Sequence, residues 1–213
     1  MEKVKLIIFD LDGTLVDAYK AIRQSFNFTM RKLGVPPRLD KTINQAVGWG
    51  DEKLLLPFVG KALIKKALKI YRSHHCLSLV KETRILPGAF DILRYLKTNG
   101  YRLAIASNRP YRFTQIILRS LGLKKFFDFV LCADQINRIK PDAQILKKIL
   151  HRFNVKADEA VYVGDMHIDA QTGNNAKVKT IIVSTGNSST LKQIKKERPF
   201  KIVSRLSILK KIF

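Results

Sequence analysis

Short, predominantly apolar runs alternate along the chain with longer segments in which apolar residues recur every three or four positions. Runs of the first kind are typical of strands buried in a parallel sheet, and segments of the second kind are typical of amphipathic helices. The predicted strands are 4–9, 101–106, 127–131, 160–163 and 180–183, and the predicted helices are 88–99, 110–121 and 141–153. This alternation predicts an α/β fold, with a parallel sheet covered by helices on both faces and joined by right-handed crossovers.

One long stretch departs from this rhythm. Between 17 and 81 the periodicity is helical and no convincing strand is present, so this segment predicts a helical insert. Its predicted helices are 18–33, 39–47 and two segments between 51 and 80, with glycines and prolines as stop signals. The tail, 200–213, is predicted to add a short edge strand and a last helix.

The composition is that of a globular protein, because 46% of the 213 residues are hydrophobic and can form a sizeable core. No segment approaches the roughly 20 apolar residues needed to cross a bilayer, and the first apolar run is too short for a secretion signal. We therefore expect a cytoplasmic protein that does not enter membranes. The two cysteines lack the spacing of a metal site or a disulfide scaffold and are expected to be reduced.

The charge is strongly positive, with 40 Lys and Arg against 17 Asp and Glu, or +23 overall. Such a balance attracts phosphates, nucleic acid or an anionic membrane surface. The basic residues are scattered through nearly every segment, however, as a general lysine bias would also produce. Nucleic-acid binding is therefore not the expected function, and the charge alone identifies no partner.

Two pairs of acidic residues follow predicted strands. Asp10 and Asp12 come directly after the first strand, with Gly13 permitting a turn, and Asp165 and Asp169 come after the fourth. Each pair alone could be turn or helix-cap residues. Because ligands bind at the carboxyl ends of parallel strands, both pairs are expected at one edge of the sheet. Carboxylates held this close repel one another unless a cation is present, and magnesium prefers such oxygen ligands.

A hydroxyl residue and a basic residue follow other strand-like segments and complete a recognisable series. The series resembles the four motifs of the haloacid dehalogenase-like hydrolase superfamily: Asp10-x-Asp12-Gly13-Thr14, Ser107-Asn108, Lys140-Pro141 and Gly164-Asp165-x-x-x-Asp169. The segments that are similar to its phosphoglycolate phosphatase-like branch are Leu86-Pro87-Gly88-Ala89 and Tyr162-Val163-Gly164-Asp165. This resemblance covers nearly the whole chain. It implies a Rossmann-like, three-layer core formed by 1–16 and 82–213, with a helical cap formed by 17–81, where periodicity alone places the helical insert.

The resemblance also implies a role for each motif residue. Asp10 would be the nucleophile that becomes phosphorylated, and Asp12 the acid that protonates the leaving group and then activates water. Ser107 and Lys140 would bind and neutralise the phosphoryl oxygens. The implied magnesium ligands are Asp10, Asp12 through its backbone carbonyl, Asp165 and Asp169, and the implied substrate-binding residues are Gly13, Thr14, Ser107, Asn108 and Lys140.

The identity of the second acid distinguishes branches of the superfamily. An Asp at position 12 favours a phosphatase or phosphomutase, since the dehalogenases lack it and the ion-pumping ATPases carry Thr there. We therefore expect a magnesium-dependent phosphatase, monomeric or dimeric, that hydrolyses a small phosphomonoester through an aspartyl-phosphate; phosphoglycolate, a nucleotide or a sugar phosphate are the candidates. A phosphomutase or pyrophosphatase is the alternative, and a non-catalytic, basic nucleic-acid-binding protein is a more distant one.

Five further positions carry hypotheses. Gly173 stands where the family usually has alanine, which would cost about 1 kcal/mol inside a helix. Trp49, in the insert, could contribute to specificity, although packing between cap helices is the commoner role of a lone aromatic. His167 is expected either to position the last motif or to touch the leaving group. His74 and His75 are adjacent and, without further ligands, make a poor metal site.

Overall fold

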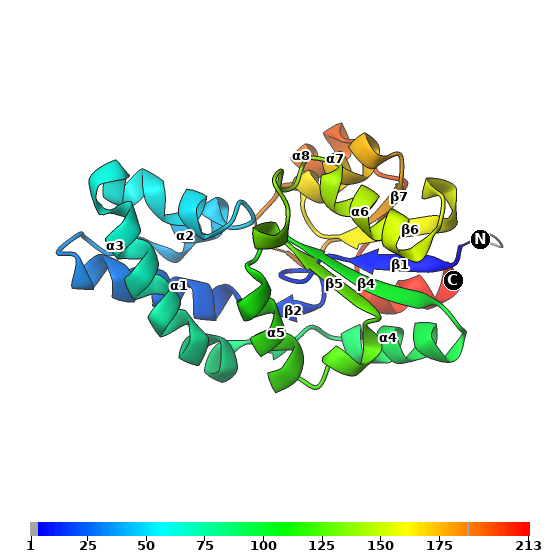
Figure 1. The fold of residues 1–213 in the computed structure, drawn as a ribbon, viewed down its shortest axis with the longest axis horizontal. Helices are drawn as coiled ribbons and strands as arrows, with labels where there is room; N and C mark the ends of the chain where they lie inside the picture. The colour runs from blue at the N-terminus through cyan, green and yellow to red at the C-terminus, as the bar shows by residue number, and fades with distance from the viewer. Residues whose placement is uncertain (1–3, 187) are drawn as a thin grey trace.

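The computed structural model describes residues 4–186 and 188–213. Its core is a six-stranded parallel sheet that contains every predicted strand (Figure 1). In spatial order the strands are β5 (Phe129–Cys132), β4 (Arg102–Ser107), β1 (Leu6–Phe9), β6 (Ala160–Gly164), β7 (Lys179–Val183) and β8 (Lys201–Val203). β8 is the edge strand predicted for the tail. β1 lies near the centre of the sheet, so the residue that follows it is surrounded by neighbouring strand ends.

Helices cover both faces of this sheet, which confirms the predicted α/β fold. On one face lie α4 (Ala89–Thr98), α5 (Tyr111–Ser120) and the 3-10 helix η4 (Leu206–Lys211), and on the other lie α6 (Gln144–Phe153), α7 (His167–Ala176) and α8 (Leu191–Lys196) (Figure 1). Short 3-10 turns occur in the connections: η1 (Lys124–Phe126), η2 (Ala133–Gln135) and η3 (Ala157–Glu159). Ile7 and Phe9 of β1 point into the core beneath α4 and α5, whereas Leu6 and Ile8 point toward α6 and α7. Side chains alternate between the two faces of the strand, and all four are buried because helices cover both faces.

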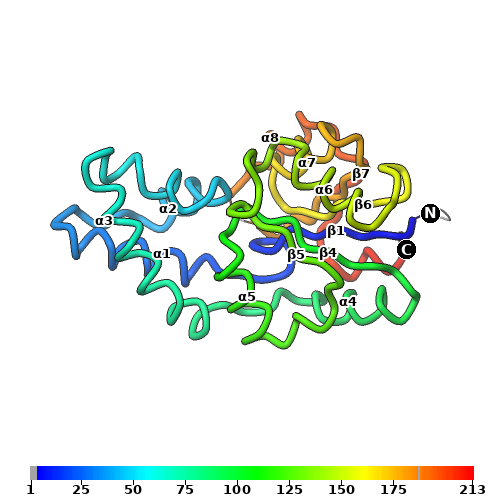
Figure 2. The backbone as a smooth tube through the Cα atoms, viewed as in Figure 1, coloured from blue at the N-terminus to red at the C-terminus, as the bar shows by residue number. Residues whose placement is uncertain are grey.

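The predicted insert is a helical cap, which forms a lobe beyond the sheet (Figure 2). Its helices are α1 (Tyr19–Lys32), α2 (Asp40–Ala46) and α3 (Asp51–Glu82). α3 consists of two helical segments, as predicted, because Gly60 within it has a φ of 69° and leaves the helical conformation. α1 packs along α3, and the second segment of α3 also contacts α5 of the core.

The chain leaves and re-enters the core through a short antiparallel ribbon of β2 (Val16–Asp17) and β3 (Arg84–Ile85). We therefore propose the domain boundaries at 16/17 and 81/82, on either side of the cap. Two predicted elements differ in detail: α6 begins at Gln144 rather than 141, and the last helix is of the 3-10 type.

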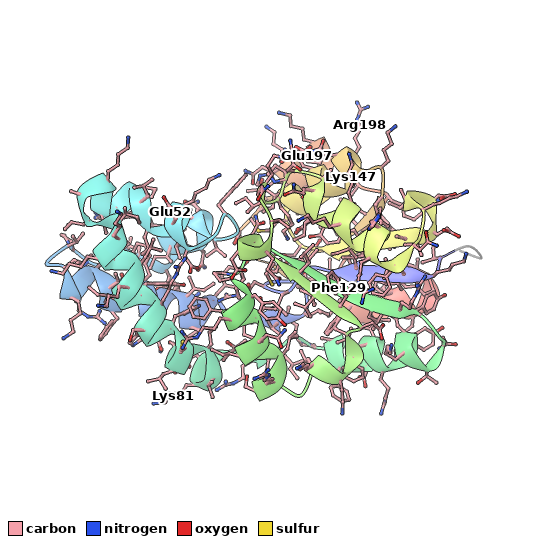
Figure 3. All side chains as sticks on the ribbon, in the orientation of Figure 1. Glu52, Lys81, Phe129, Lys147, Glu197 and Arg198 are labelled. Carbon is pink, nitrogen blue, oxygen red and sulfur yellow. The ribbon has the colours of Figure 1, made fainter. Side chains whose placement is uncertain are left out.

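Charged side chains occupy much of the surface. The exposed Lys81 on the cap and Lys147 on the core lie far apart in the molecule (Figure 3). Within the described part of the chain, no helix combines the length and the apolar character needed to cross a bilayer.

Candidate active site

A pocket of about 50 Å³ lies between the cap and the carboxyl ends of the strands. Its core side includes residues of the predicted motifs and one neighbour: Asp10, Asp12, Ser107, Asn108, Arg109 and Lys140. The cap side includes Val47, Gly48, Gly50, Asp51, Leu54 and Tyr71. The parallel sheet explains why the motif residues converge, since each follows a strand whose carboxyl end faces the same way.

Lys140 is buried at the centre of a group of acidic and phenolic oxygens. Its Nζ donates to Oδ1 of Asp10 at 2.6 Å, to Oδ1 of Asp169 at 2.7 Å and to the hydroxyl of Tyr162 at 2.9 Å. Burial opposes its charge, but the two carboxylates raise the pKa of Lys140 above its usual range. A permanent cation is therefore fixed beside Asp10.

The acidic residues beside Lys140 are shielded from water. Burial raises the pKa of Asp10 to about 7, an effect that Lys140 opposes and the charge of Asp169 reinforces. Burial also raises the pKa of Asp165, and the charges of Asp169 and Asp10 add to this effect. Such crowding of carboxyl groups disfavours their ionised forms unless more positive charge is supplied.

The arrangement fits a divalent cation. One oxygen each of Asp10, Asp165 and Asp169 lies within 4.8 Å of the others, and all three residues are buried. Oδ2 of Asp165 is buried and has no hydrogen-bond partner among the described residues. A Cβ atom on Gly13 or on Gly186 would overlap this oxygen, so both glycines keep its surroundings open. Buried carboxylate oxygens suit a hard cation, which would also relieve their repulsion.

The predicted metal ligands differ in how free their side chains are. Asp169 uses Oδ1 for Lys140, and its Oδ2 accepts the backbone N–H groups of Asp165 at 3.2 Å and Met166 at 3.0 Å. These bonds orient both Asp169 and Lys140. The carboxylate of Asp12 lies outside the three-residue group and is engaged elsewhere.

Asn108 links three parts of the site. Its amide nitrogen donates to the backbone oxygens of Gly48 in the cap at 2.9 Å and of Lys140 at 3.1 Å, and its Oδ1 accepts the N–H of Lys140 at 2.9 Å. These bonds position the Lys140 loop and the cap loop and leave the side chain little capacity to bind a substrate.

Two hydroxyl residues from the predicted set lie near Asp10. The Ser107 hydroxyl accepts the N–H of Arg109 at 3.1 Å and can donate its proton into the pocket. Thr14 donates to Oδ1 of Asp165 at 2.9 Å, so its side chain orients a predicted metal ligand. Ser107 is thus the hydroxyl residue that faces the pocket.

Arg109 is a buried residue of the pocket that sequence reasoning missed. Its guanidinium binds Asp12 in a bidentate manner, from Nε to Oδ2 at 2.7 Å and from Nη2 to Oδ1 at 2.9 Å. Its Nη1 lies 2.8 Å from Nε2 of His75, which belongs to the cap helix α3. The signal for Arg109 was its position directly after Ser107-Asn108; nothing in the sequence indicated His75 as its partner.

The region from residue 7 to residue 183 matches the family model for haloacid dehalogenase-like hydrolases. The chain belongs to this family. A phosphoglycolate phosphatase from Nitrosospira multiformis is 30% identical over 86% of this chain and 84% of its own, and one from Aquifex aeolicus is 29% identical over 86% of each. Among solved structures, one described as a predicted phosphoglycolate phosphatase from Haemophilus somnus superposes with a TM-score of 0.94 at 24% identity, covering 100% of this chain and 99% of its own. This likeness shows that the core and cap have the fold of that protein.

The remaining predicted residues of this haloacid dehalogenase-like hydrolase lie around the site rather than at its centre. His167 is bonded through Nδ1 to the Ser189 hydroxyl at 2.8 Å, and its ring lies 6.2 Å from that of Trp49. Neither aromatic side chain lines the pocket in the described part of the chain, which favours the loop-positioning hypothesis for His167. His74 stacks on Phe28 in the cap, at a ring distance of 4.2 Å.

Proposed function

We propose that this protein is a magnesium-dependent phosphatase that hydrolyses a small phosphomonoester through a phosphorylated Asp10. The observation that carries the proposal is the environment of Asp10, at the end of the central strand. Nζ of Lys140 lies 2.6 Å from Oδ1 of Asp10, the buried carboxylate of Asp165 lies close by, and Ser107 faces the same pocket. A nucleophilic carboxylate needs such cationic surroundings to approach a phosphate dianion.

In the proposed first step, a carboxylate oxygen of Asp10 attacks phosphorus, and the bond from phosphorus to the ester oxygen breaks. Asp12 gives its proton to that oxygen. In the second step, Asp12 removes a proton from water, which attacks phosphorus and releases Asp10 and inorganic phosphate. Lys140 and the Ser107 hydroxyl hold the phosphoryl oxygens throughout.

Asp10, Asp165, Asp169 and the backbone carbonyl of Asp12 would hold the metal. When bound, magnesium neutralises charge on the carboxylates and on the phosphoryl group. The chain itself orients this set, because Thr14 positions Asp165 and the backbone N–H groups of Asp165 and Met166 position Asp169.

The pocket favours a small leaving group. In this arrangement of cap and core the pocket, of about 50 Å³, leaves little room for a nucleoside or a hexose beside the phosphoryl group. The names of the relatives from Nitrosospira multiformis and Aquifex aeolicus point in the same direction, to phosphoglycolate. The smallest carboxylate-bearing phosphomonoester is thus our preferred substrate.

The test is phosphate release from a panel that contains phosphoglycolate, nucleotides, sugar phosphates and pyrophosphate. Each would be incubated with magnesium or with EDTA, using the unmodified protein and Asp10→Asn. We expect turnover that requires magnesium and falls by at least about 10³-fold in Asp10→Asn, because the nucleophile is lost. Equal background release by both proteins would refute the proposal, and an isomerised sugar phosphate among the products would indicate a mutase.

A further inference from the structure

Arg109 places a second cation in the pocket, and the phosphoryl chemistry above does not use it. Among the described residues that line the pocket, Lys140 and Arg109 are the two basic ones. Lys140 contacts Asp10 and Asp169, and the proposed mechanism assigns it to the phosphoryl group. Apolar side chains form much of the remaining wall, including Ile22, Leu54, Met166 and Ile168. An anionic leaving group would therefore find its counter-charge at Arg109.

The guanidinium is held rigidly by the cap. Burial, with the positive charge of Arg109 beside it, lowers the pKa of His75 to about 2, so its ring is neutral. Because an arginine only donates, Nε2 of His75 must accept the bond from Nη1, and its Nδ1 carries the proton toward Ser25. Tyr71 stacks on the His75 ring and Phe113 packs edge-on against it, at ring distances of 4.7 and 5.1 Å.

The guanidinium still has donor capacity. Of its five N–H groups, two bind Asp12 and one binds His75, which leaves one on each terminal nitrogen in the contacts made by the described residues. Asp51 also lines this part of the pocket, but Nε of Arg72 donates to its Oδ2 at 3.1 Å. That carboxylate thus has a cationic partner of its own.

The ion pair between Arg109 and Asp12 conflicts with the proposed role of Asp12. Both of its oxygens are bound by Arg109, yet an acid that protonates the leaving group must turn an oxygen toward the ester. A carboxylate on the substrate offers the same two-oxygen fork to the guanidinium and could take the place of Asp12.

We propose that Arg109 is the specificity-determining residue of this site: it binds a carboxylate on the leaving group and in exchange releases Asp12 for proton transfer. This rests on the proposed function and narrows the substrate class to phosphomonoesters with a carboxylate close to the ester oxygen. The exchange couples recognition to catalysis, because an ester without that carboxylate leaves Asp12 bound to Arg109.

The test is a binding experiment in an Asp10→Asn background, which removes turnover. Phosphoglycolate would be titrated beside 2-hydroxyethyl phosphate, the same two-carbon ester with a hydroxymethyl group in place of the carboxylate, using isothermal titration calorimetry. We expect phosphoglycolate to bind at least about tenfold more tightly, because it gains a charge-assisted fork to Arg109. Equal affinities would overturn the proposal, and this comparison leaves Arg109 unchanged.

Two further variants distinguish binding of the substrate carboxylate by Arg109 from a role of Arg109 in positioning Asp12 alone. Adding Arg109→Gln should bring the two affinities within about twofold of each other, whereas adding Asp12→Asn should strengthen phosphoglycolate binding several-fold by removing the competing carboxylate. Discrimination that survives Arg109→Gln, or weaker phosphoglycolate binding in Asp12→Asn, would overturn the proposal. Circular dichroism would confirm folding. The proposed function is tested separately: if it is wrong, the unmodified protein will release no more phosphate than Asp10→Asn.

Discussion

At the scale of single residues, the site depends on space as much as on charge. The carboxylate of Asp165 fits between Gly13 and Gly186, where any Cβ atom would overlap its Oδ2. Gly186 lies in the loop after β7, and the neighbouring Thr185 donates to the backbone oxygen of Gly13 at 2.6 Å. The two glycine loops are therefore tied to each other as well as to the carboxylate.

We predict that Gly186→Ala raises the magnesium concentration needed for half-maximal activity by at least about tenfold, because the added methyl group displaces a ligand. The measurement is activity against magnesium concentration, together with the thermal shift caused by magnesium. Gly60→Ala is the matched control. Its Cβ would contact nothing within 4 Å, so the magnesium midpoint should not change, whereas the positive φ of 69° at this position should make alanine lower the stability. An unchanged midpoint in Gly186→Ala would contradict this account of Asp165.

The sequence placed the motif residues correctly but could not specify what their side chains bind. The side chains of Thr14 and Asn108 hold Asp165 and the Lys140 loop, and their binding to substrate stays a prediction. A spacing pattern indicates which residues follow a strand. It carries no information on which neighbouring group each side chain forms a hydrogen bond with.

At the scale of elements, the apolar pattern was most reliable for strands that are buried on both faces. β1, β4 and β6 are continuous apolar runs because helices cover both sides of the sheet, and all five predicted strands are present. The start of α6 was misjudged, since the residues after Lys140 form a turn that positions that lysine before the helix begins. At Gly173, helix propensity and the close packing of α7 against β7 make opposite predictions.

We predict that Gly173→Ala destabilises the protein, although alanine favours an isolated helix by about 1 kcal/mol. A Cβ at this position would overlap the Thr180 hydroxyl of β7 and lie 3.0 Å from the backbone oxygen of Val178, so the helix and strand would have to separate. Urea unfolding should show a loss of about 1–3 kcal/mol. Removing the hydroxyl with Thr180→Ala should recover part of that loss, and a stabilised Gly173→Ala protein would show that propensity outweighs the contact.

At the scale of the whole molecule, the sheet and the helical cap follow from the pattern of the chain, but their docking does not. Arg109 and His75 are 34 positions apart and belong to core and cap respectively. Their contact depends on how α3 lies against α5, and helical periodicity leaves that choice open because it describes each helix separately. This explains why His75 could not be predicted as the partner of Arg109, although Arg109 itself stands beside a motif.

The buried His75 should make the stability of the whole molecule depend on pH. Its pKa is about 2 in the folded protein and about 6.5 in the unfolded chain, so the unfolded state binds more protons between these values. The contribution of a neutral His75 is therefore complete above about pH 6.5 and is lost as the pH falls, by up to about 1.4 kcal/mol per pH unit. His74 and Arg109 add positive charge beside the ring and so favour its neutral form.

The matched variant is His75→Gln, which keeps an acceptor for Arg109 but cannot titrate. Between pH 6.5 and 4.5 we expect the unmodified protein to lose roughly 2–3 kcal/mol more unfolding free energy than His75→Gln, measured by urea unfolding at both values. Carboxylates elsewhere titrate in both proteins, so the difference isolates His75. Parallel pH profiles would mean that the ring accepts a proton without leaving its place between cap and core, and that the contact between them does not require a neutral His75.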